Sequence, residues 1–410
     1  MKRVSILAVV LVTAIAANAQ KFNEKKILKH IKTLSSDKLQ GRGAGTEAAR
    51  EAAYYIAQEF RNLKLQPKGG QGANKDAYLD LFSFNAGAHG EGKMLTGFNV
   101  AAYLDNGAAT TVVIGAHYDH LGMGDQGSSL NANPKGKIHN GADDNASGVA
   151  GVIELARYFS TNNIAEKNNF LFICFSAEEN GLLGSKAYTE RPTIDLTKVN
   201  YMINMDMIGR LDPTTKTLLV NGTGTSPVWE TLVKGLENED VRIKTDSSGV
   251  GPSDHTSFYL KNIPVLHFFT GSHSDYHKPS DDWEKINLKG EGDVLSIIAK
   301  VINSVDSYPK LSFLTTKTKP MGTRSAFKVT MGVMPSYSSN VEGLKVDGVS
   351  EGKPAQKAGI LTGDVIIQIG DFVIKDIQNY MEALGKFEKG QTVPVKVKRG
   401  DEVITVSITF

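Results

Sequence analysis

The chain has 410 residues and a formal net charge of +2, from 46 basic and 44 acidic residues. At about 150 residues per domain, this length predicts two or three domains. Apolar residues make up 40% of the chain and charged residues 22%, which is typical of an ordinary globular protein. Basic residues neither cluster nor alternate with aromatic residues, so the composition argues against nucleic acid as a partner.

The N-terminus has the pattern of a secretory signal peptide. Lys2 and Arg3 precede a short apolar segment, residues 4–16, and Ala17-Asn18-Ala19 forms a small-x-small cleavage site. The apolar segment is too short to span a bilayer comfortably, and no other segment is long and apolar enough, so no stable membrane span is expected. We therefore predict a cleaved signal at residues 1–19 and a secreted or periplasmic protein. A retained anchor is the alternative.

From residue 20 to residue 308, strand-like segments alternate with segments of helical periodicity. Helices are expected at 23–34, 46–63, 147–156, 181–189, 227–236 and 292–305, and strands at 78–84, 98–103, 111–114, 170–175, 201–205, 218–220 and 263–269. This alternation predicts an α/β domain with a mixed, mostly parallel sheet sandwiched by helices. The single cysteine, Cys174, lies in one of these strands and is expected to be a buried apolar side chain.

The pattern changes in the last hundred residues. Residues 309–321 are rich in Lys, Thr and Pro and are predicted to be a linker. After them come short β-branched segments at 327–333, 343–349, 364–369, 393–398 and 403–409, and one helical segment at 377–384. A small β-rich domain is therefore expected at residues 322–410.

The first chemical motif is GAHYDHLG, residues 115–122, which follows the apolar segment 111–114. A parallel strand that ends in His-x-Asp places polar side chains at its carboxyl edge, where open α/β sheets bind ligands. His117 can give a neutral imidazole to a metal, and Asp119 can accept the proton of the other ring nitrogen. A loop histidine beside a solvated aspartate is the alternative.

Three further segments carry acidic residues at expected strand ends or helix starts. Asp143 and Asp144 stand before a helix, where one of them can bridge two cations or simply cap the helix. Glu178 and Glu179 follow a strand, so one can bind metal while the other acts as a general base; an acidic helix start is the alternative. Asp206 ends a buried strand, where an unpaired charge is costly.

A fourth segment, SDYHKPSDD at 274–282, contains His277, which taken alone is an ordinary loop histidine. Together these segments supply a mixed nitrogen and oxygen donor set that suits zinc. Two ions about 3.5–4 Å apart that share one carboxylate would activate a water and polarise a carbonyl. The predicted ligands are His117, Asp144, Glu179, Asp206 and His277.

The motifs GAHYDHLG, GADDNASG, FSAEENGLLGS, NMDMIG and DYHKPSD, taken in this order, resemble the co-catalytic di-zinc exopeptidases. This family includes bacterial secreted leucyl aminopeptidases and, more distantly, glutamate carboxypeptidases and glutaminyl cyclases. The resemblance covers roughly residues 24–308 and implies the zinc aminopeptidase fold. It also implies two Zn²⁺ ions, one held by His117 and Asp206 and the other by Glu179 and His277, with Asp144 bridging them.

The resemblance implies further roles around these ligands. Asp143 competes with Asp144 for the bridging role, and the peptide bond after the bridging aspartate is often cis in this family. Glu178 matches the general base, and Asp119 matches the carboxylate that orients the first histidine. Tyr276 matches a position that donates its hydroxyl to the developing oxyanion in some members. The segment Ser253-Asp254-His255, with Phe258, resembles one near the substrate pocket.

The C-terminal segment PAQKAGILTGD, residues 354–364, is similar to bacterial protease-type PDZ domains. The resemblance puts Gly332 and Val333 in the loop that binds a peptide carboxylate, although MGVM departs from the usual sequence of that loop. It implies capture of peptide C-termini by strand addition. A domain that only packs is the alternative.

The combined prediction is a secreted zinc aminopeptidase that hydrolyses N-terminal residues of peptides with a metal-activated water and Glu178 as the base. One rival is a carboxypeptidase or glutaminyl cyclase on the same fold. The other is a non-catalytic peptide-binding protein that uses only its PDZ domain.

Overall fold

The computed structural model describes residues 22–70, 76–85, 93–125, 128–131, 133–316, 329–335, 341–349, 352–375 and 377–410. The predicted signal peptide, the end of the predicted linker (317–321) and the first two residues of the strand expected at 327–333 lie outside the described residues. In the described remainder of that strand only Val333 is extended into a ladder, at the start of β10, so the expected strand begins later than predicted. Within the described part, no helix has the length and apolar character needed to cross a membrane.

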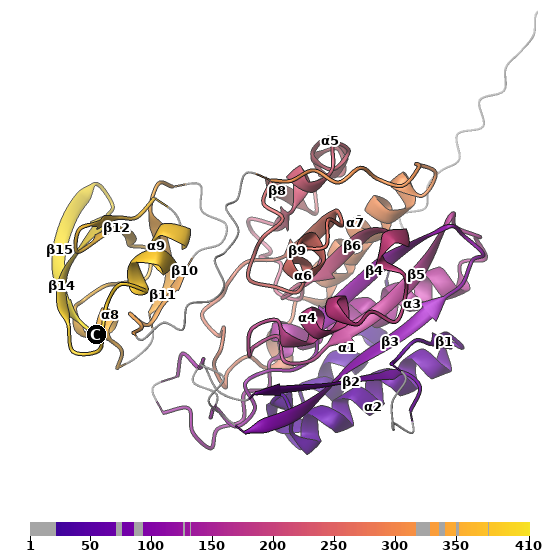
Figure 1. Ribbon diagram of the computed structural model, residues 1–410, viewed down its shortest axis with the longest axis horizontal. Coiled ribbons are helices and arrows are strands. Elements are labelled where there is room, and N and C mark those ends of the chain that lie inside the picture. Colours follow the sequence, from indigo (N-terminus) through magenta and orange to yellow (C-terminus); the bar gives the residue numbers. More distant parts are fainter. Residues whose placement is uncertain are drawn as a thin grey trace, which may run out of the picture.

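The first sheet has nine strands, in the order β1-β3-β5-β4-β6-β9-β7-β8, and β2 also pairs with β3 (Figure 1). Strands β5, β4, β6 and β9 run parallel in its centre, whereas β1, β2 and β3 form an antiparallel edge. The predicted mixed α/β sheet is confirmed, although β1 and β8 were not expected. The bounds are β1 (Gln66–Pro67), β2 (Leu79–Asn85), β3 (Met94–Leu104), β4 (Thr110–His117), β5 (Asn168–Phe175), β6 (Val199–Met205), β7 (Thr217–Asn221), β8 (Arg242–Asp246) and β9 (Val265–Phe269).

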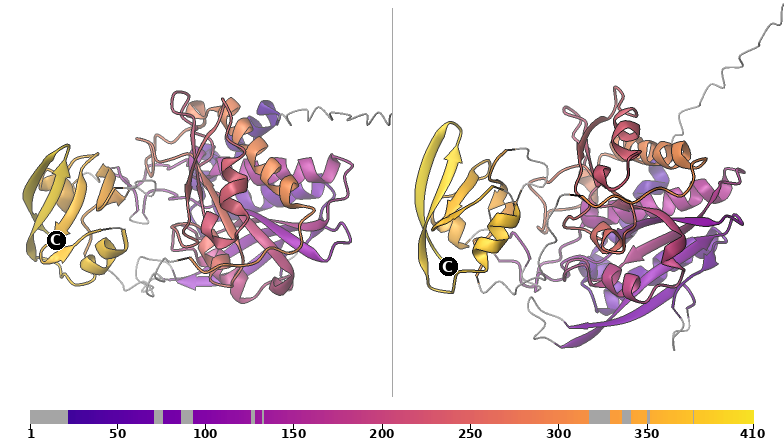
Figure 2. Two further views of the ribbon diagram at one scale, coloured as in Figure 1. Left: turned by 90° about the horizontal axis from the view of Figure 1, so that it is seen from above. Right: turned by 45° about the horizontal axis from the view of Figure 1, so that its top comes forward.

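Helices cover both faces of this sheet (Figure 2). Side chains alternate along β5, so Phe170, Phe172 and Cys174 pack into one core and Leu171, Ile173 and Phe175 into the other. Helices α1, α2, α3, α5 and α7 contribute to the first core, and α4 and α6 to the second. The bounds are α1 (Glu24–Leu34), α2 (Glu47–Asn62), α3 (Gly148–Thr161), α4 (Leu183–Glu190), α5 (Trp229–Lys234), α6 (His255–Tyr259) and α7 (Leu288–Val305).

Local sequence explains where the first helices begin. Asn23 Oδ1 accepts hydrogen bonds from Lys25 N at 3.0 Å and Lys26 N at 3.3 Å and so caps α1. Thr46 Oγ1 accepts one from Ala49 N at 3.2 Å. Each such cap stabilises a helix by about 1 kcal/mol. Short helical turns also occur as η1 (Asp37–Arg42), η2 (Ala142–Ser147), η3 (Leu196–Lys198), η4 (Thr223–Thr225) and η5 (Trp283–Lys285).

The second sheet is antiparallel, in the order β10-β11-β12-β14-β15, with β13 on β12. Its core includes Val346, Ile366, Val395 and Val397. The described strands confirm the predicted β-rich C-terminal segment, and its helix at 377–384 is also confirmed. The bounds are β10 (Val333–Pro335), β11 (Leu344–Val349), β12 (Val365–Ile369), β13 (Phe372–Val373), β14 (Thr392–Arg399), β15 (Glu402–Thr409), α8 (Pro354–Lys357) and α9 (Ile377–Leu384).

Candidate metal centre

Five predicted ligands converge at the carboxyl edge of the central parallel strands. His117 is the last residue of β4, and Asp206 directly follows β6. The other three come from the turn before α3, the segment after β5 and the segment after β9: Asp144, Glu179 and His277. Because parallel strands end at one edge of the sheet, side chains far apart in the sequence meet there.

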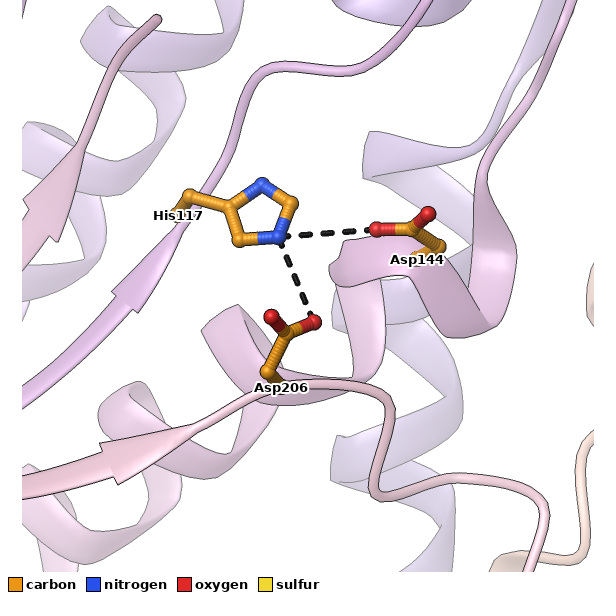
Figure 3. A group of neighbouring side chains, drawn as sticks. All are labelled: His117, Asp144 and Asp206. Atoms are coloured by element: carbon orange, nitrogen blue, oxygen red, sulfur yellow. Dashed lines mark hydrogen bonds and ion pairs between the residues drawn. The ribbon is translucent and has the colours of Figure 1, made fainter. Parts of the chain in front are cut away.

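Asp144 lies between the two histidines. Its Oδ1 is 3.5 Å from His117 Nε2, and its Oδ2 is 3.2 Å from His277 Nε2. Asp206 Oδ1 is 3.3 Å from the same His117 nitrogen (Figure 3), and Glu179 Oε2 is 3.2 Å from the same His277 nitrogen. The centre therefore has two halves, His117 with Asp206 and His277 with Glu179, that share the carboxylate of Asp144.

Asp143 faces away from this centre. Its Oδ1 accepts a hydrogen bond from Gly209 N at 2.7 Å, and its Oδ2 lies 3.1 Å from His273 Nε2. The buried carboxylate of Asp281 accepts hydrogen bonds from the main-chain N–H groups of both Asp143 and Asp144. Of the two adjacent aspartates, Asp144 is the one that contacts His117 and His277. The Asp144–Asn145 peptide bond is cis.

Asp119 contacts different atoms from those that the sequence predicts. His117 Nδ1 lies 3.1 Å from the main-chain oxygen of Asp119, but 3.8 Å from its carboxylate Oδ1. The carboxylate instead accepts hydrogen bonds from Glu178 N at 3.0 Å and Glu179 N at 3.3 Å. Burial raises the pKa of Asp119 to about 7. The main chain of Asp119 thus orients His117, while its side chain holds the main chain of the two glutamates.

The two adjacent glutamates have opposite electrostatic surroundings. Burial raises the pKa of Glu178 well above its usual value; His117 opposes this shift and Glu179 adds to it. Burial would also raise the pKa of Glu179, but His277 and His120 hold it well below its usual value. Glu179 is therefore the ionised glutamate, and Glu178 is the one that retains a proton more readily. This division suits Glu179 as a metal ligand and Glu178 as a base.

The loop after the first motif fixes the orientation of His277. Ser128 O lies 2.9 Å from His277 Nδ1, and Leu130 N donates a hydrogen bond to His277 O at 3.0 Å. Since a main-chain carbonyl faces Nδ1 in both His117 and His277, each ring turns Nε2 toward the carboxylates, as metal-binding histidines do.

His120 belongs to the centre but was not predicted as part of it. Among the described residues, two groups could each hold a metal ion. One is His117, Asp144 and Asp206, and the other is His120, Asp144 and Glu179; within each group the ligand atoms lie within 4.8 Å of one another. His120 Nδ1 lies 2.8 Å from Glu179 Oε1. Its place three residues after His117 in the first motif is the sequence signal that could have identified it.

Arg42 is a second residue that the sequence analysis missed. Its side chain is fully buried, and burial lowers its pKa to about 10 although Asp144 and Asp119 favour its charge. It donates hydrogen bonds of 2.6–2.9 Å to four main-chain oxygens, those of Leu34, Tyr118, Asn140 and Gly141. Arg42 therefore ties the segment of His117 and Asp119 to the turn that carries Asp144.

A small pocket opens over the centre. It is lined by both glutamates, by an apolar wall of Met207, Pro252 and Phe269, and by the predicted ligands His117, Asp144, Asp206 and His277. Tyr276 also lines it, and the ring of Tyr276 stacks on His277 with 3.9 Å between ring centroids. Of the segment expected near the substrate, Asp254 and His255 are buried beside the site and Phe258 lies in the core.

Comparison with known proteins gives two family matches. Residues 99–302 match peptidase family M28, and residues 329–410 match the PDZ domain family. Leupeptin-inactivating enzyme 1 from Streptomyces exfoliatus is 29% identical over 265 residues, which are 64% of this chain and 52% of that protein. Aminopeptidase YwaD from Bacillus subtilis is 31% identical over 173 residues, 38% of this chain and 36% of that protein. The matches span about half or less of these two relatives.

Solved structures share the fold at lower sequence identity. A glutaminyl cyclase from Bacteroides thetaiotaomicron aligns with a TM-score of 0.56 at 17% identity, over 70% of this chain and 99% of that chain. The sheet order, the convergent histidines and carboxylates, and the family matches agree. The chain therefore carries a segment of peptidase family M28, residues 99–302, followed by a PDZ domain, residues 329–410.

Proposed function

We propose that the protein is a secreted or periplasmic aminopeptidase that uses two zinc ions to hydrolyse N-terminal residues of peptides. The observation that carries this proposal is the position of Asp144, whose two oxygens face His117 and His277 separately. A carboxylate shared by two histidine-containing halves is the arrangement that a pair of divalent ions needs. The aminopeptidase relative supports the reaction class.

The side chains would divide between two ions. His117 and Asp206 would hold one, Glu179 and His277 the other, and Asp144 both. When bound, the ions would supply Lewis acidity to a water and to the scissile carbonyl. Imidazole nitrogen and carboxylate oxygen are the ligands that zinc accepts in catalytic sites, so the residues present fit the metal.

Glu178 is the proposed general base. It lines the pocket, is only partly exposed, and has a pKa raised by burial, so its carboxylate can take a proton from the attacking water. The same carboxyl group would then deliver the proton to the leaving amine nitrogen. Tyr276, held against His277, would donate its hydroxyl to the oxyanion that develops on the carbonyl oxygen.

The test is a panel of aminoacyl substrates with free and blocked N-termini, assayed with and without a chelator. We expect the protein to turn over only the substrates with a free amine, to lose this activity with the chelator and to regain it when zinc is added. Glu178→Ala should lower kcat about 10²–10⁴-fold while the zinc content is retained. Wild-type activity in this variant would show that another group is the base.

The same panel separates the rivals. A carboxypeptidase would remove C-terminal residues from N-blocked peptides. A glutaminyl cyclase would release ammonia from N-terminal glutamine without cutting a peptide bond, and the fold shared with the Bacteroides thetaiotaomicron enzyme is the reason to include this substrate. A protein that binds peptides only through its PDZ domain would contain no zinc and turn over none of these substrates.

We also propose that the PDZ domain binds peptide C-termini and that the chain is exported through residues 1–19. The first point rests on the PDZ match at residues 329–410, in which Gly332 precedes strand β10. Titration with peptides that have free or amidated C-termini tests it; equal or absent binding would favour a packing role. N-terminal sequencing of the exported protein tests the cleavage site.

A further inference from the structure

We infer that His120 is a positioning residue that turns Glu179 so that one carboxylate oxygen faces the proposed zinc position. The inference rests on the proposed metal centre and adds a residue outside its five expected ligands. Glu179 has different partners on its two oxygens: Oε1 lies 2.8 Å from His120 Nδ1, and Oε2 lies 3.2 Å from His277 Nε2. One oxygen is thus held from behind while the other points to the centre.

The contact with Glu179 is the main polar contact of the His120 ring. It is fully buried, and its Nε2 has no hydrogen-bond partner in the described part of the chain. The contact of Nδ1 with Asp144 is longer, 3.7 Å to Oδ2. Burying an imidazole with one unsatisfied nitrogen costs free energy. That cost is offset where the other nitrogen donates to an ionised carboxylate, which makes a stronger hydrogen bond than a neutral acceptor.

Neighbouring residues hold the ring in place. His120 N donates a hydrogen bond to Arg42 O at 3.3 Å, and a β-bridge joins His120 to Gly43. On the other side is Gly141, at φ 55°, where an added Cβ would stand 2.6 Å from Cγ and Cδ2 of the ring. The ring therefore fills space that a side chain at position 141 would need. A histidine held this tightly restricts the rotation of Glu179 as well.

The effect on the metal follows from this restriction. A free carboxylate can turn either oxygen, or both, toward a cation, whereas one whose Oε1 is held by His120 keeps Oε2 turned toward the centre. Hydrogen bonds behind metal ligands typically change metal affinity about 10–100-fold when they are removed. Since Glu179 belongs to the half of the centre with His277, the loss should fall on one of the two zinc equivalents.

The experiment compares zinc binding by the full-length wild-type protein, His120→Ala and His120→Asn. The side-chain amide of asparagine can place a nitrogen donor where His120 has Nδ1, but it lacks the rest of the ring. We expect His120→Ala to bind one equivalent normally and the other about 10–100-fold more weakly in competition with a chelator. His120→Asn should stay within a few-fold of wild type. The absorption spectrum of the cobalt-substituted protein should change at one equivalent in His120→Ala only.

A matched control is His30, a buried histidine on α1 that lies 3.2 Å from the carboxylate of Glu154. His30→Ala removes a similar buried pair away from the centre, so it should lower the unfolding temperature and leave both zinc affinities unchanged. If His120→Ala behaves like His30→Ala, the role is structural and the inference is wrong. If His120→Asn is as weak as His120→Ala, the ring nitrogen binds the metal directly, which also overturns it.

Zinc binding by the wild-type protein distinguishes a failure of this inference from a failure of the proposed function. If the wild-type protein binds no zinc, both the inference and the proposed function are wrong. If it binds two equivalents and His120→Ala binds them with the same affinities, the proposed function stands and only the role of His120 is rejected.

Discussion

His117 and His277 approach one carboxylate from opposite sides, with His117 Nε2 3.5 Å from Asp144 Oδ1 and His277 Nε2 3.2 Å from Asp144 Oδ2. His117 ends β4 and His277 lies in the segment after β9, two strands that do not pair directly with each other. Asp144 is thus the one side chain on which both halves of the centre depend.

Asp144→Asn should therefore weaken both zinc equivalents at once and lower kcat/KM about 10³-fold, since losing the shared charge removes several kcal/mol of metal-based stabilisation. Metal analysis after dialysis and steady-state kinetics would measure this. Asp143→Asn is the matched control, because Asp143 faces His273 instead. It should lose stability but keep both zinc ions. Equal zinc loss in the two variants would contradict the bridging role.

Arg42→Gln should lower the free energy of unfolding by about 3 kcal/mol or more. The variant leaves buried main-chain oxygens without a donor, at about 1–3 kcal/mol for each. Arg42→Lys keeps the charge but has only three donors for four acceptors, so its loss should be smaller. Denaturant unfolding measures both. Arg50, an exposed residue paired with Glu47, is the control, and Arg50→Gln should change stability by less than about 0.5 kcal/mol.

Glu291 should make the folded protein less stable as the pH rises. Its carboxyl group on α7 is fully buried, and neither oxygen has a partner among the residues that the structure describes. Burial raises its pKa well above the usual value, and Asp143 adds to the shift. The folded state thus keeps a proton that the unfolded state releases. Stability should be level below the unfolded pKa, about 4.3, and fall from there up to the raised folded pKa.

Glu291→Gln should remove this slope and stabilise the protein at pH 8 by about 1.4 kcal/mol per unit of pKa shift. Unfolding curves at pH values from 4 to 8 would measure it. Glu284→Gln, at an exposed position, should leave the slope of the wild type unchanged. Identical slopes in Glu291→Gln and wild type would show that Glu291 does not titrate as expected.

Asp364 and Arg399 should stabilise the PDZ domain at neutral pH. The Arg399 guanidinium donates two hydrogen bonds of 2.8 Å to the buried carboxylate and lowers the pKa of Asp364. Because the folded pKa is below the unfolded one, this stabilisation is complete above about pH 4 and is lost as the pH falls through the folded value. Asp364→Asn should cost about 1–2 kcal/mol at pH 7, reduced by the partial exposure of Arg399.

Hydrogen exchange of the β14 and β15 amides in the full-length chain would report this loss. Protection should fall at pH 7, and the difference from wild type should persist down to about pH 4 and shrink only as the pH falls below it. Asp371→Asn, at an exposed turn, should leave the protection unchanged. An equal loss of protection at all pH values would mean that packing, not ionisation, makes Asp364 important.

The sequence predicted the central strands and the residues at their ends because both leave local signals. The segment 111–114 is β-branched throughout and apolar from Val112 on, as strands buried on both faces are, and His117 and Asp119 follow within five residues. Helix α6 (His255–Tyr259) was missed because it is short and because His255, Thr256 and Ser257, although polar, are all buried. Its burial depends on neighbours that no local pattern contains.

The contacts within the centre were harder to predict. The spacing of His117 and Asp119 predicts that the two side chains pair, but the turn directs the carboxylate of Asp119 to the amides of Glu178 and Glu179. His120 stands beside Glu179, fifty-nine positions away, only because β4 and β5 pair in parallel. Such contacts follow from strand pairing, which a single sequence does not specify.

The four main-chain oxygens that accept hydrogen bonds from Arg42 limit how far the chain can be truncated at its N-terminus. The M28 match begins at residue 99, whereas the guanidinium that joins the turns around Tyr118 and Gly141 comes from well before it. A fragment cloned from that match would leave out the cation that joins these two turns. A fragment that keeps this anchor must begin ahead of Arg42, so the segment before the family match belongs to the proposed metal centre as much as the match itself.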